Sequence, residues 1–130
     1  MSRSSLDANM VLRVILNDVP DHADRAARFL DSSPCYLTDV VIVECVFVLE
    51  KTYKLDRDFI TDSLSSLFEL KTLEYNEAQI TEAFDLYVSL RTLSFADCYS
   101  VAEARLSGNQ LITFDRAILK KCGSAATEPE

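Results

Sequence analysis

The chain has 130 residues, which is enough for one domain with a hydrophobic core. Hydrophobic residues make up 48% of it, with only two Gly and three Pro, a composition that excludes a disordered chain. The net charge of −8 excludes a nucleic-acid binder that relies on overall positive charge. Any contact with nucleic acid must therefore depend on a metal ion, on local basic residues or on a partner chain.

The cysteines do not indicate a zinc site, because Cys35, Cys45, Cys98 and Cys122 form no C-x-x-C pair and the chain has only one histidine, His22. Cys45 and Cys98 lie in apolar helical patterns and are expected to be buried thiols. Reduced cysteines are typical of cytosolic proteins. The sequence has no signal-peptide pattern and no apolar run of membrane length, so we expect a soluble, cytoplasmic protein without membrane contact.

Short strands alternate with helices in the first half of the chain. In order, we expect a strand at 3–6, a helix at 9–16, a helix from Pro20 or Asp21, a strand at 35–37, and a helix from Thr38 or Asp39 to about Tyr53. This last helix is apolar on nearly all sides, so we expect most of it to be buried. Its β-branched run also fits a strand, but its length and its end, E-K-T-Y-K, favour a helix.

The second half continues the alternation. We expect a helix from Asp56 or Asp58, a strand at 72–75, a helix after Asn76, a helix from Ser94 to about Leu106, a strand at 110–114 and a helix at 116–121. Residues 123–130 read as a polar, disordered tail. The whole pattern predicts a single domain over residues 1–122, an α/β protein built as a three-layer α/β/α sandwich around a parallel sheet of short strands.

Four acidic residues lie where buried segments end or turn. Asp7 follows the first strand, Asp115 follows the last, Asp97 is in the first turn of a helix, and Glu44 lies two turns into another. Sites in parallel α/β sheets form at the carboxyl ends of the strands, so these four side chains are expected to converge. Carboxylates in apolar surroundings are costly without a positive partner, and a shared Mg²⁺ or Mn²⁺ ion removes that cost.

The motifs D-A-N-M-V-L-R, the Glu within an apolar helix, S-F-A-D-C-Y-S-V-A-E-A and L-I-T-F-D-R-A together resemble the PIN-domain ribonucleases, most closely the VapC-type toxins of bacterial toxin–antitoxin pairs. The resemblance runs from Leu6 to about Lys120. It implies cleavage of RNA with Mg²⁺ or Mn²⁺, a homodimer, and inhibition by a small antitoxin protein. Family members usually continue into a last apolar strand, whereas this chain ends in a polar tail, so an edge strand is expected to be missing.

The resemblance places the family's acidic quartet on Asp7, Glu44, Asp97 and Asp115. We expect Asp7, Asp97 and Asp115 to be metal ligands, and Glu44 to ligate a second metal ion or to help activate the attacking water. A bound Mg²⁺ makes a nucleophile from water, orients a phosphate and offsets its developing charge. No motif contains a histidine, so a histidine-based ribonuclease mechanism is excluded.

Four further residues complete the expected site. Asn9 and Thr113 match the family's small polar residues and are expected to orient a carboxylate or a metal-bound water. Arg13 and Arg116 lie near the quartet in the sequence and are candidates for phosphate contacts, with ordinary surface ion pairs as the alternative.

Each acidic residue also has a purely structural interpretation. Asp7 and Asp97 are suitable helix caps and Asp115 suits a turn, whereas Glu44 in an apolar run is hardest to explain without a partner. Apolar residues of the first helix and of the helices between 39 and 70 have three possible roles: a dimer face, an antitoxin groove or core.

Three alternatives to a toxin nuclease remain open. One is a PIN-like RNA-processing nuclease outside any toxin pair, and another is a non-catalytic protein-binding module of the same fold. A response-regulator receiver domain also clusters carboxylates at a parallel sheet, but it needs a Lys after a late strand, and the sequence offers no convincing one.

Overall fold

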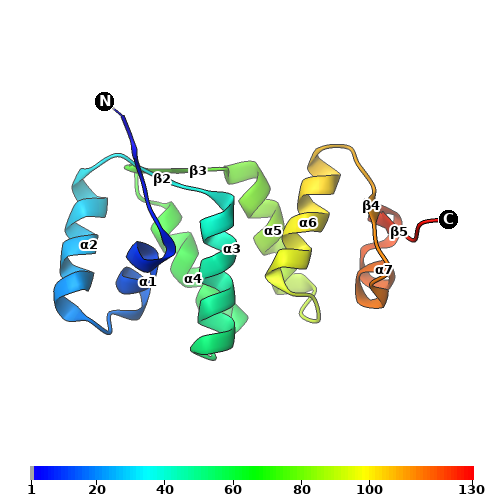
Figure 1. Ribbon diagram of the computed structural model, residues 1–130, viewed down its shortest axis with the longest axis horizontal. Helices are drawn as coiled ribbons and strands as arrows, with labels where there is room; N and C mark the ends of the chain where they lie inside the picture. The colour runs from blue at the N-terminus through cyan, green and yellow to red at the C-terminus, as the bar shows by residue number, and fades with distance from the viewer. Residues whose placement is uncertain (1) are drawn as a thin grey trace. The chain divides into compact units, whose positions relative to one another are not determined.

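The computed structural model describes residues 2–130, and the chain divides into two compact units, Met1–Asn76 (unit 1) and Glu77–Glu130 (unit 2) (Figure 1). Each unit contains both helices and parallel strands. The α/β class expected from the alternating pattern is therefore confirmed. The single domain expected over residues 1–122 stays a prediction. None of the helices within residues 2–130 is long and apolar enough to cross a membrane.

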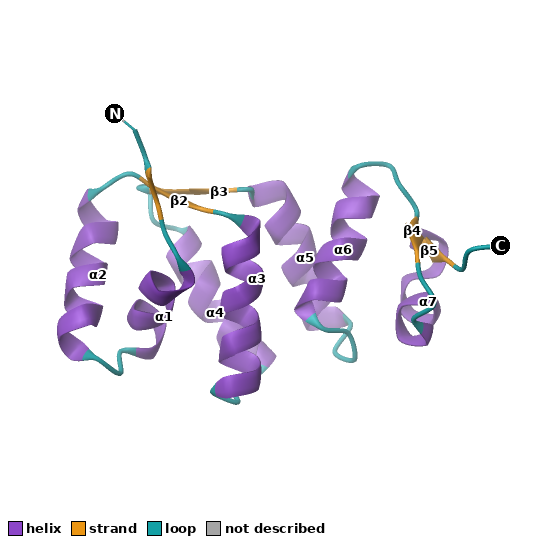
Figure 2. Cartoon of the chain, in the orientation of Figure 1, coloured by secondary structure: helices purple, strands orange, loops and turns teal. Residues whose placement is uncertain are grey.

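Unit 1 alternates strands with helices. Its elements are β1 (Ser4–Ser5), α1 (Ala8–Leu16), α2 (Pro20–Ser32), β2 (Cys35–Leu37), α3 (Asp39–Phe47), the π-helical segment η1 (Val48–Thr52), α4 (Arg57–Phe68) and β3 (Leu73–Tyr75). The strands are parallel, in the order β1-β2-β3, with β2 in the centre. In Figure 2, β2 and β3 run along the upper edge of unit 1 and the helices lie beneath them.

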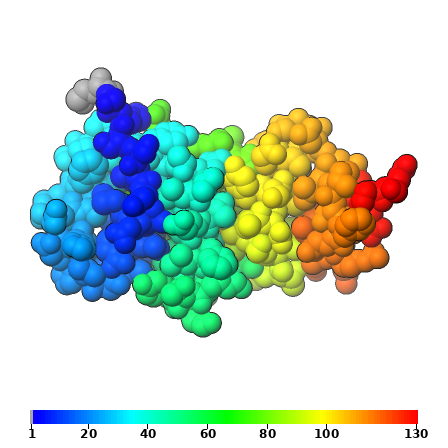
Figure 3. Space-filling view, viewed as in Figure 1, coloured from blue at the N-terminus to red at the C-terminus, as the bar shows by residue number. Residues whose placement is uncertain are grey.

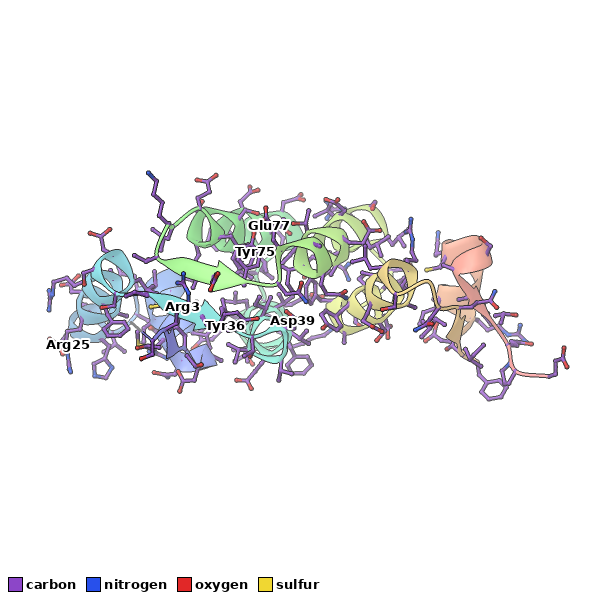
Figure 4. The ribbon with its side chains drawn as sticks, turned by 90° about the horizontal axis from the view of Figure 1, so that it is seen from above. Arg3, Arg25, Tyr36, Asp39, Tyr75 and Glu77 are labelled. Carbon is purple, nitrogen blue, oxygen red and sulfur yellow. The ribbon has the colours of Figure 1, made fainter. Side chains whose placement is uncertain are left out.

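The register of the unit 1 sheet separates a buried face from an open one. Cys35, Leu37 and Leu73 are buried, whereas Glu74, which pairs in register with the half-buried Tyr36, is exposed. This alternation follows from the two-residue period of a strand. On the open side, Arg3 lies across the strands and its Nη1 donates to the Thr72 carbonyl oxygen at 3.0 Å (Figure 4).

Side-chain caps fix the beginnings of the helices in unit 1. Thr38 Oγ1 accepts a hydrogen bond from the Val41 N–H at the start of α3, and Asp56 Oδ1 accepts one from the Phe59 N–H at the start of α4. Both residues are among the caps predicted from the sequence. Such caps satisfy backbone donors that have no partner inside the helix.

The prediction that α3 is mostly buried is wrong for one of its faces. Ile42, Cys45 and Val46 are fully buried, and α1 packs against this helix. On the opposite side, 76% of Val40 and 62% of Phe47 are exposed. The helix therefore uses only one stripe of its apolar surface inside unit 1, because a stripe of three or four residues in every two turns is enough to pack a helix.

Unit 2 is built around a pair of helices. Its elements are α5 (Glu77–Ser89), α6 (Phe95–Leu106), β4 (Leu111–Ile112), α7 (Arg116–Cys122), the 3₁₀ segment η2 (Gly123–Ala125) and β5 (Ala126–Thr127). α5 packs against α6, and the Tyr87 ring lies 5.3 Å from the Phe95 ring, edge to face. Ser94 Oγ caps α6, as predicted, and Gly108 takes a positive φ of 74° just after that helix ends.

The disordered tail expected at residues 123–130 is wrong for its first part. Ala126 and Thr127 form β5, which pairs in parallel with β4, and Ala126 is buried. Thr113 N–H donates to the Thr127 carbonyl oxygen at 3.0 Å, and Arg116 Nη1 lies 3.0 Å from Glu128 Oε1. The last strand that the sequence analysis expected to be missing is present as this short segment.

Candidate active site

Asp7 lies at the junction of β1 and α1. It is the N-cap of α1, and its Oδ1 accepts a hydrogen bond from the Met10 N–H at 3.0 Å. The side chain is exposed. A carboxylate in this position is stabilised by the partial positive charge of the helix N-terminus, and capping leaves its second oxygen for another ligand.

The negative charges of Glu44 and Asp7 both affect the pKa of the same buried thiol, that of Cys45. Cys45 lies beside Glu44 on α3, and its Sγ is 4.0 Å from the Ala8 carbonyl oxygen on α1. Burial, with smaller contributions from the charges of Glu44 and Asp7, raises the pKa of Cys45 to about 12. Both carboxylates therefore lie within electrostatic range of the Cys45 thiol, Asp7 from the start of α1 and Glu44 from α3.

Glu44 is not buried, so its carboxylate does not lose the hydration that the sequence suggested it would lose. Its side chain is exposed on the same side of α3 as Val40 and Phe47. The expectation of an apolar environment was wrong because this face of the helix is open within the chain.

Asp97 lies in the first turn of α6 in unit 2. Its N–H donates to Ser94 Oγ at 3.1 Å, and its side chain is half-buried. Burial raises the pKa of the Cys122 thiol; the Arg105 guanidinium opposes this rise and the Asp97 carboxylate adds to it. Asp97 is thus within electrostatic reach of the end of α7.

Asp115 is the N-cap of α7, and its Oδ1 accepts from the Ile118 N–H at 3.0 Å. The Asp115 N–H donates to Thr113 Oγ1 at 2.9 Å, so Thr113 holds the backbone from which Asp115 projects. No hydrogen bond joins Asp115 to Asp97 within the described part of unit 2.

A divalent cation requires oxygen ligands whose charge is not already neutralised by a protein cation. Within the described residues, no ion pair engages Asp7, Glu44, Asp97 or Asp115, so their charges are not neutralised by Lys or Arg. In neither unit do three His, Cys, Asp or Glu side chains among residues 2–130 gather closely enough to enclose a metal ion. Mg²⁺ is commonly held by one or two carboxylates and several waters, and the exposed side chains of Asp7 and Glu44 offer oxygen ligands of that kind.

The remaining candidates have ordinary contacts. Arg13 Nη1 pairs with Asp18 Oδ1 at 2.8 Å, and the Arg116 side chain, which pairs with Glu128, is highly exposed. Asn9 is exposed on α1.

One group of residues escaped the sequence analysis. A pocket of about 560 Å³ in unit 1 is lined in part by His22, Arg25 and Phe29 of α2. Their helical spacing places them on one face, which is the signal that was available in the sequence.

One known protein family matches this chain. The PIN domain family matches residues 5–123. No curated protein matches the chain significantly. The seven α-helices and the parallel strands of residues 2–130 are consistent with the PIN-like α/β/α fold. Because the match covers most of the chain, this protein belongs to the PIN domain family, whose members are typically nucleases.

Proposed function

We propose that this protein is a Mg²⁺- or Mn²⁺-dependent endoribonuclease that hydrolyses RNA phosphodiester bonds. PIN nucleases act on RNA and generally use divalent metal ions. The observation that carries the proposal for this chain is the match of the PIN domain family to residues 5–123, which include Asp7, Glu44, Asp97 and Asp115, four carboxylates that form no ion pair among the described residues. Like charges held together are stabilised by a shared cation.

Each member of the quartet has a distinct part in the proposed reaction. Asp7, Asp97 and Asp115 supply metal ligands, and Glu44 either ligates a second ion or accepts a proton from the attacking water. The metal ion, when bound, lowers the pKa of its water and offsets the negative charge that develops on the phosphate. Thr113 positions Asp115 through the backbone hydrogen bond described above. The family match across both units supports one catalytic domain over residues 1–122.

We further propose that the nuclease is the VapC-type toxin of a type II toxin–antitoxin pair. A groove of about 570 Å³ between α1, α2 and α4 supports this role. Its apolar lining includes Val14, Ile15, Leu30, Leu67 and Leu70. An amphipathic antitoxin helix suits such a groove, and the exposed apolar side chains of α3 suit a homodimer contact.

Cleavage of cellular RNA by the purified protein tests the nuclease proposal. We expect cutting of a mixed pool of structured RNAs with Mg²⁺ or Mn²⁺, suppression by EDTA, and loss of cutting in Asp97→Asn. The variant Asp62→Asn, which removes a carboxylate from the exposed side of α4, is the control for the change in charge. Full activity in chelator, or in Asp97→Asn, would remove the metal or the residue from the mechanism.

Antitoxin binding is tested separately. We expect the product of an adjacent small gene to copurify with the protein and to suppress cutting. We expect Ala27→Arg, a change on an exposed position of α2 at the groove, to release it. An active nuclease with no such neighbour would instead support the RNA-processing alternative. A folded protein that binds a partner and cuts nothing would support the binding-module alternative.

A further inference from the structure

A second pocket of unit 1 combines basic, amide and aromatic side chains. It is an open surface pocket lined by residues of β1, α1 and α2, with a volume of about 560 Å³, which is within the range of small-ligand sites. The side chains that give it this character are Asn9, Arg13, His22, Arg25 and Phe29. Figure 3 shows the β1 and α1 residues in dark blue at the surface beside the lighter blue α2.

The pocket is cationic in an acidic protein. The lining includes two arginines and the only histidine, and no Asp or Glu is among the described residues that line it. The chain as a whole carries a net charge of −8. Guanidinium donors gathered on such an acidic chain favour an anionic ligand at this position over the surrounding surface.

Both arginines have bonding capacity to spare. Arg13 uses Nη1 for Asp18, and its Nε is shielded from solvent without a hydrogen-bond partner among the described residues. A buried donor left unsatisfied is unfavourable, and an anion would relieve it. Arg25 lies on the outer side of α2 (Figure 4) and meets Asp21 at 3.6 Å, with both side chains largely exposed. Such a surface pair is weak, so a phosphate can compete for the guanidinium.

An aromatic ring lies on the same helix face as the cations. His22, Arg25 and Phe29 recur at intervals of three and four residues on α2, and 39% of Phe29 is exposed. Arginine next to an exposed aromatic ring is the combination by which proteins hold a single-stranded nucleic acid, with a phosphate on the cation and a base on the ring.

The pocket also lies next to the proposed catalytic carboxylate. Leu6 and Asn9, which flank Asp7 in the sequence, both line it. We propose that this pocket is a subsite for the RNA strand, in which Arg13 and Arg25 bind a backbone phosphate beside the scissile one and Phe29 stacks on a base. The assignment rests on the proposed nuclease function, and it names residues that select single-stranded RNA at that site.

Binding is measured without cleavage by fluorescence polarisation of a short single-stranded RNA in EDTA. We expect Arg25→Ala to weaken binding about threefold to tenfold and to lower the slope of log K against log salt by about 0.7, the loss of one phosphate contact to a single strand. The matched control is Arg28→Ala, which removes the same charge from an exposed position of α2 outside this pocket. We expect Arg28→Ala to leave RNA affinity within twofold.

Stacking is tested by a second pair of variants. We expect Phe29→Leu, which keeps an apolar side chain but removes the ring, to weaken RNA binding about fivefold or more. Phe59→Leu makes the same change at an exposed phenylalanine of α4 and is expected to have no effect. Circular dichroism of all four variants checks that each is folded.

The failure of this proposal is distinguishable from failure of the nuclease assignment. Metal-dependent hydrolysis of bis(p-nitrophenyl) phosphate by the wild-type protein reports on the catalytic centre without an RNA strand. On RNA, we expect Arg25→Ala to raise KM with little change in kcat. Equal loss of RNA binding in Arg25→Ala and Arg28→Ala would overturn the subsite, as would no loss in either. If Arg25→Ala weakens the binding of polyglutamate but leaves RNA affinity unchanged, the pocket binds an acidic peptide instead.

Discussion

Asp7 has an observed structural role and a proposed catalytic role, and one substitution separates them. Its carboxylate caps α1, and in the proposed function it also binds the metal ion. Asn caps a helix about as well as Asp, whereas Ala does not. We therefore expect Asp7→Asn to abolish metal-dependent cleavage with little loss of stability. Asp7→Ala is expected to abolish cleavage and to lower the free energy of unfolding by about 1 kcal/mol. RNA cleavage assays and urea unfolding measure the two effects.

Asp56 provides the matched control for this experiment. It caps α4 through the same geometry, with Oδ1 accepting from the Phe59 N–H at 2.8 Å, but it is not in the candidate site. Asp56→Asn should leave both cleavage and stability close to those of the wild type. Retention of cleavage in Asp7→Asn would show that Asp7 is a structural cap only.

The Cys45 thiol is expected to be unreactive in the folded protein. It is fully buried, with its pKa raised to about 12, whereas Cys122 is half-buried. Only the thiolate reacts readily, so at neutral pH iodoacetamide should modify Cys122 first and Cys45 only after unfolding. Mass spectrometry of the labelled peptides measures the order. Rapid labelling of Cys45 in the folded state would contradict its burial between α1 and α3.

The same pKa shift has a consequence for stability. The ordinary thiol pKa is 9.0, so above that value the unfolded state loses its proton before the folded state does. The free energy of unfolding should therefore fall as the pH rises from about 9 toward about 12, at up to about 1.4 kcal/mol per pH unit. Comparing Cys45→Ala with the wild type by urea unfolding at several alkaline pH values isolates this contribution, because the variant lacks it.

At the scale of single residues, local chemistry was the most predictable part. The caps Thr38, Asp56 and Ser94 were recognised because a cap depends on a side chain and a backbone donor three residues away. The exposure of Glu44 was not predicted, because it depends on which face of α3 the remaining chain covers. Arg25 was missed for a similar reason, as a pocket between α1 and α2 is visible only when both helices are in place.

At the scale of elements, β5 is the clearest departure from expectation. The segment A-A-T has weak strand propensity and follows a glycine in a polar stretch, so its sequence suggested disorder. Pairing with β4 stabilises this segment as a strand despite its weak propensity, because backbone hydrogen bonds to a neighbouring strand do not depend on the side chains. Position-specific pairing of this kind joins residues far apart in sequence, which local patterns do not encode.

Removal of β5 tests its contribution. We expect a chain ending at Ser124 to lose the β4–β5 pairing, the buried Ala126 and the Arg116–Glu128 ion pair. Thr113 N–H, which donates to the Thr127 carbonyl oxygen, should then lose protection from hydrogen exchange. A chain ending at Glu128 keeps these contacts and serves as the control. Equal protection of the Thr113 amide in both chains would show that β5 contributes nothing to unit 2.

At the scale of the whole molecule, the alternation of strands and helices was sufficient to predict the fold class. Periods of two and of about 3.6 residues mark strands and helices, and parallel pairing follows from the helices that connect successive strands. The convergence of all four acidic residues requires long-range placement of Asp97 and Asp115 relative to Asp7 and Glu44, which the periods do not specify. The resemblance to PIN domains supplied that expectation, and it remains a prediction.

Metal binding should reverse the effect that the negative charge of Glu44 has on the stability of the protein. In the proposed cation site Glu44 and Asp7 repel each other when no metal is bound, so Glu44→Gln is expected to raise the melting temperature of the metal-free protein slightly. With Mg²⁺ or Mn²⁺ present, the wild type should gain stability by mass action, about 2.7 kcal/mol at a hundredfold excess over Kd. Glu44→Gln should gain much less, because one of the carboxylates that attract the cation has been removed.

Thermal denaturation of both proteins, with and without metal, measures this reversal. Sodium chloride at matched ionic strength separates specific binding from screening, because screening weakens the repulsion between the two carboxylates without occupying a site. Asp62→Asn controls for a loss of negative charge elsewhere in unit 1 and should keep the full metal-induced shift. If wild type and Glu44→Gln gain equally from the metal, Glu44 is not part of the cation site.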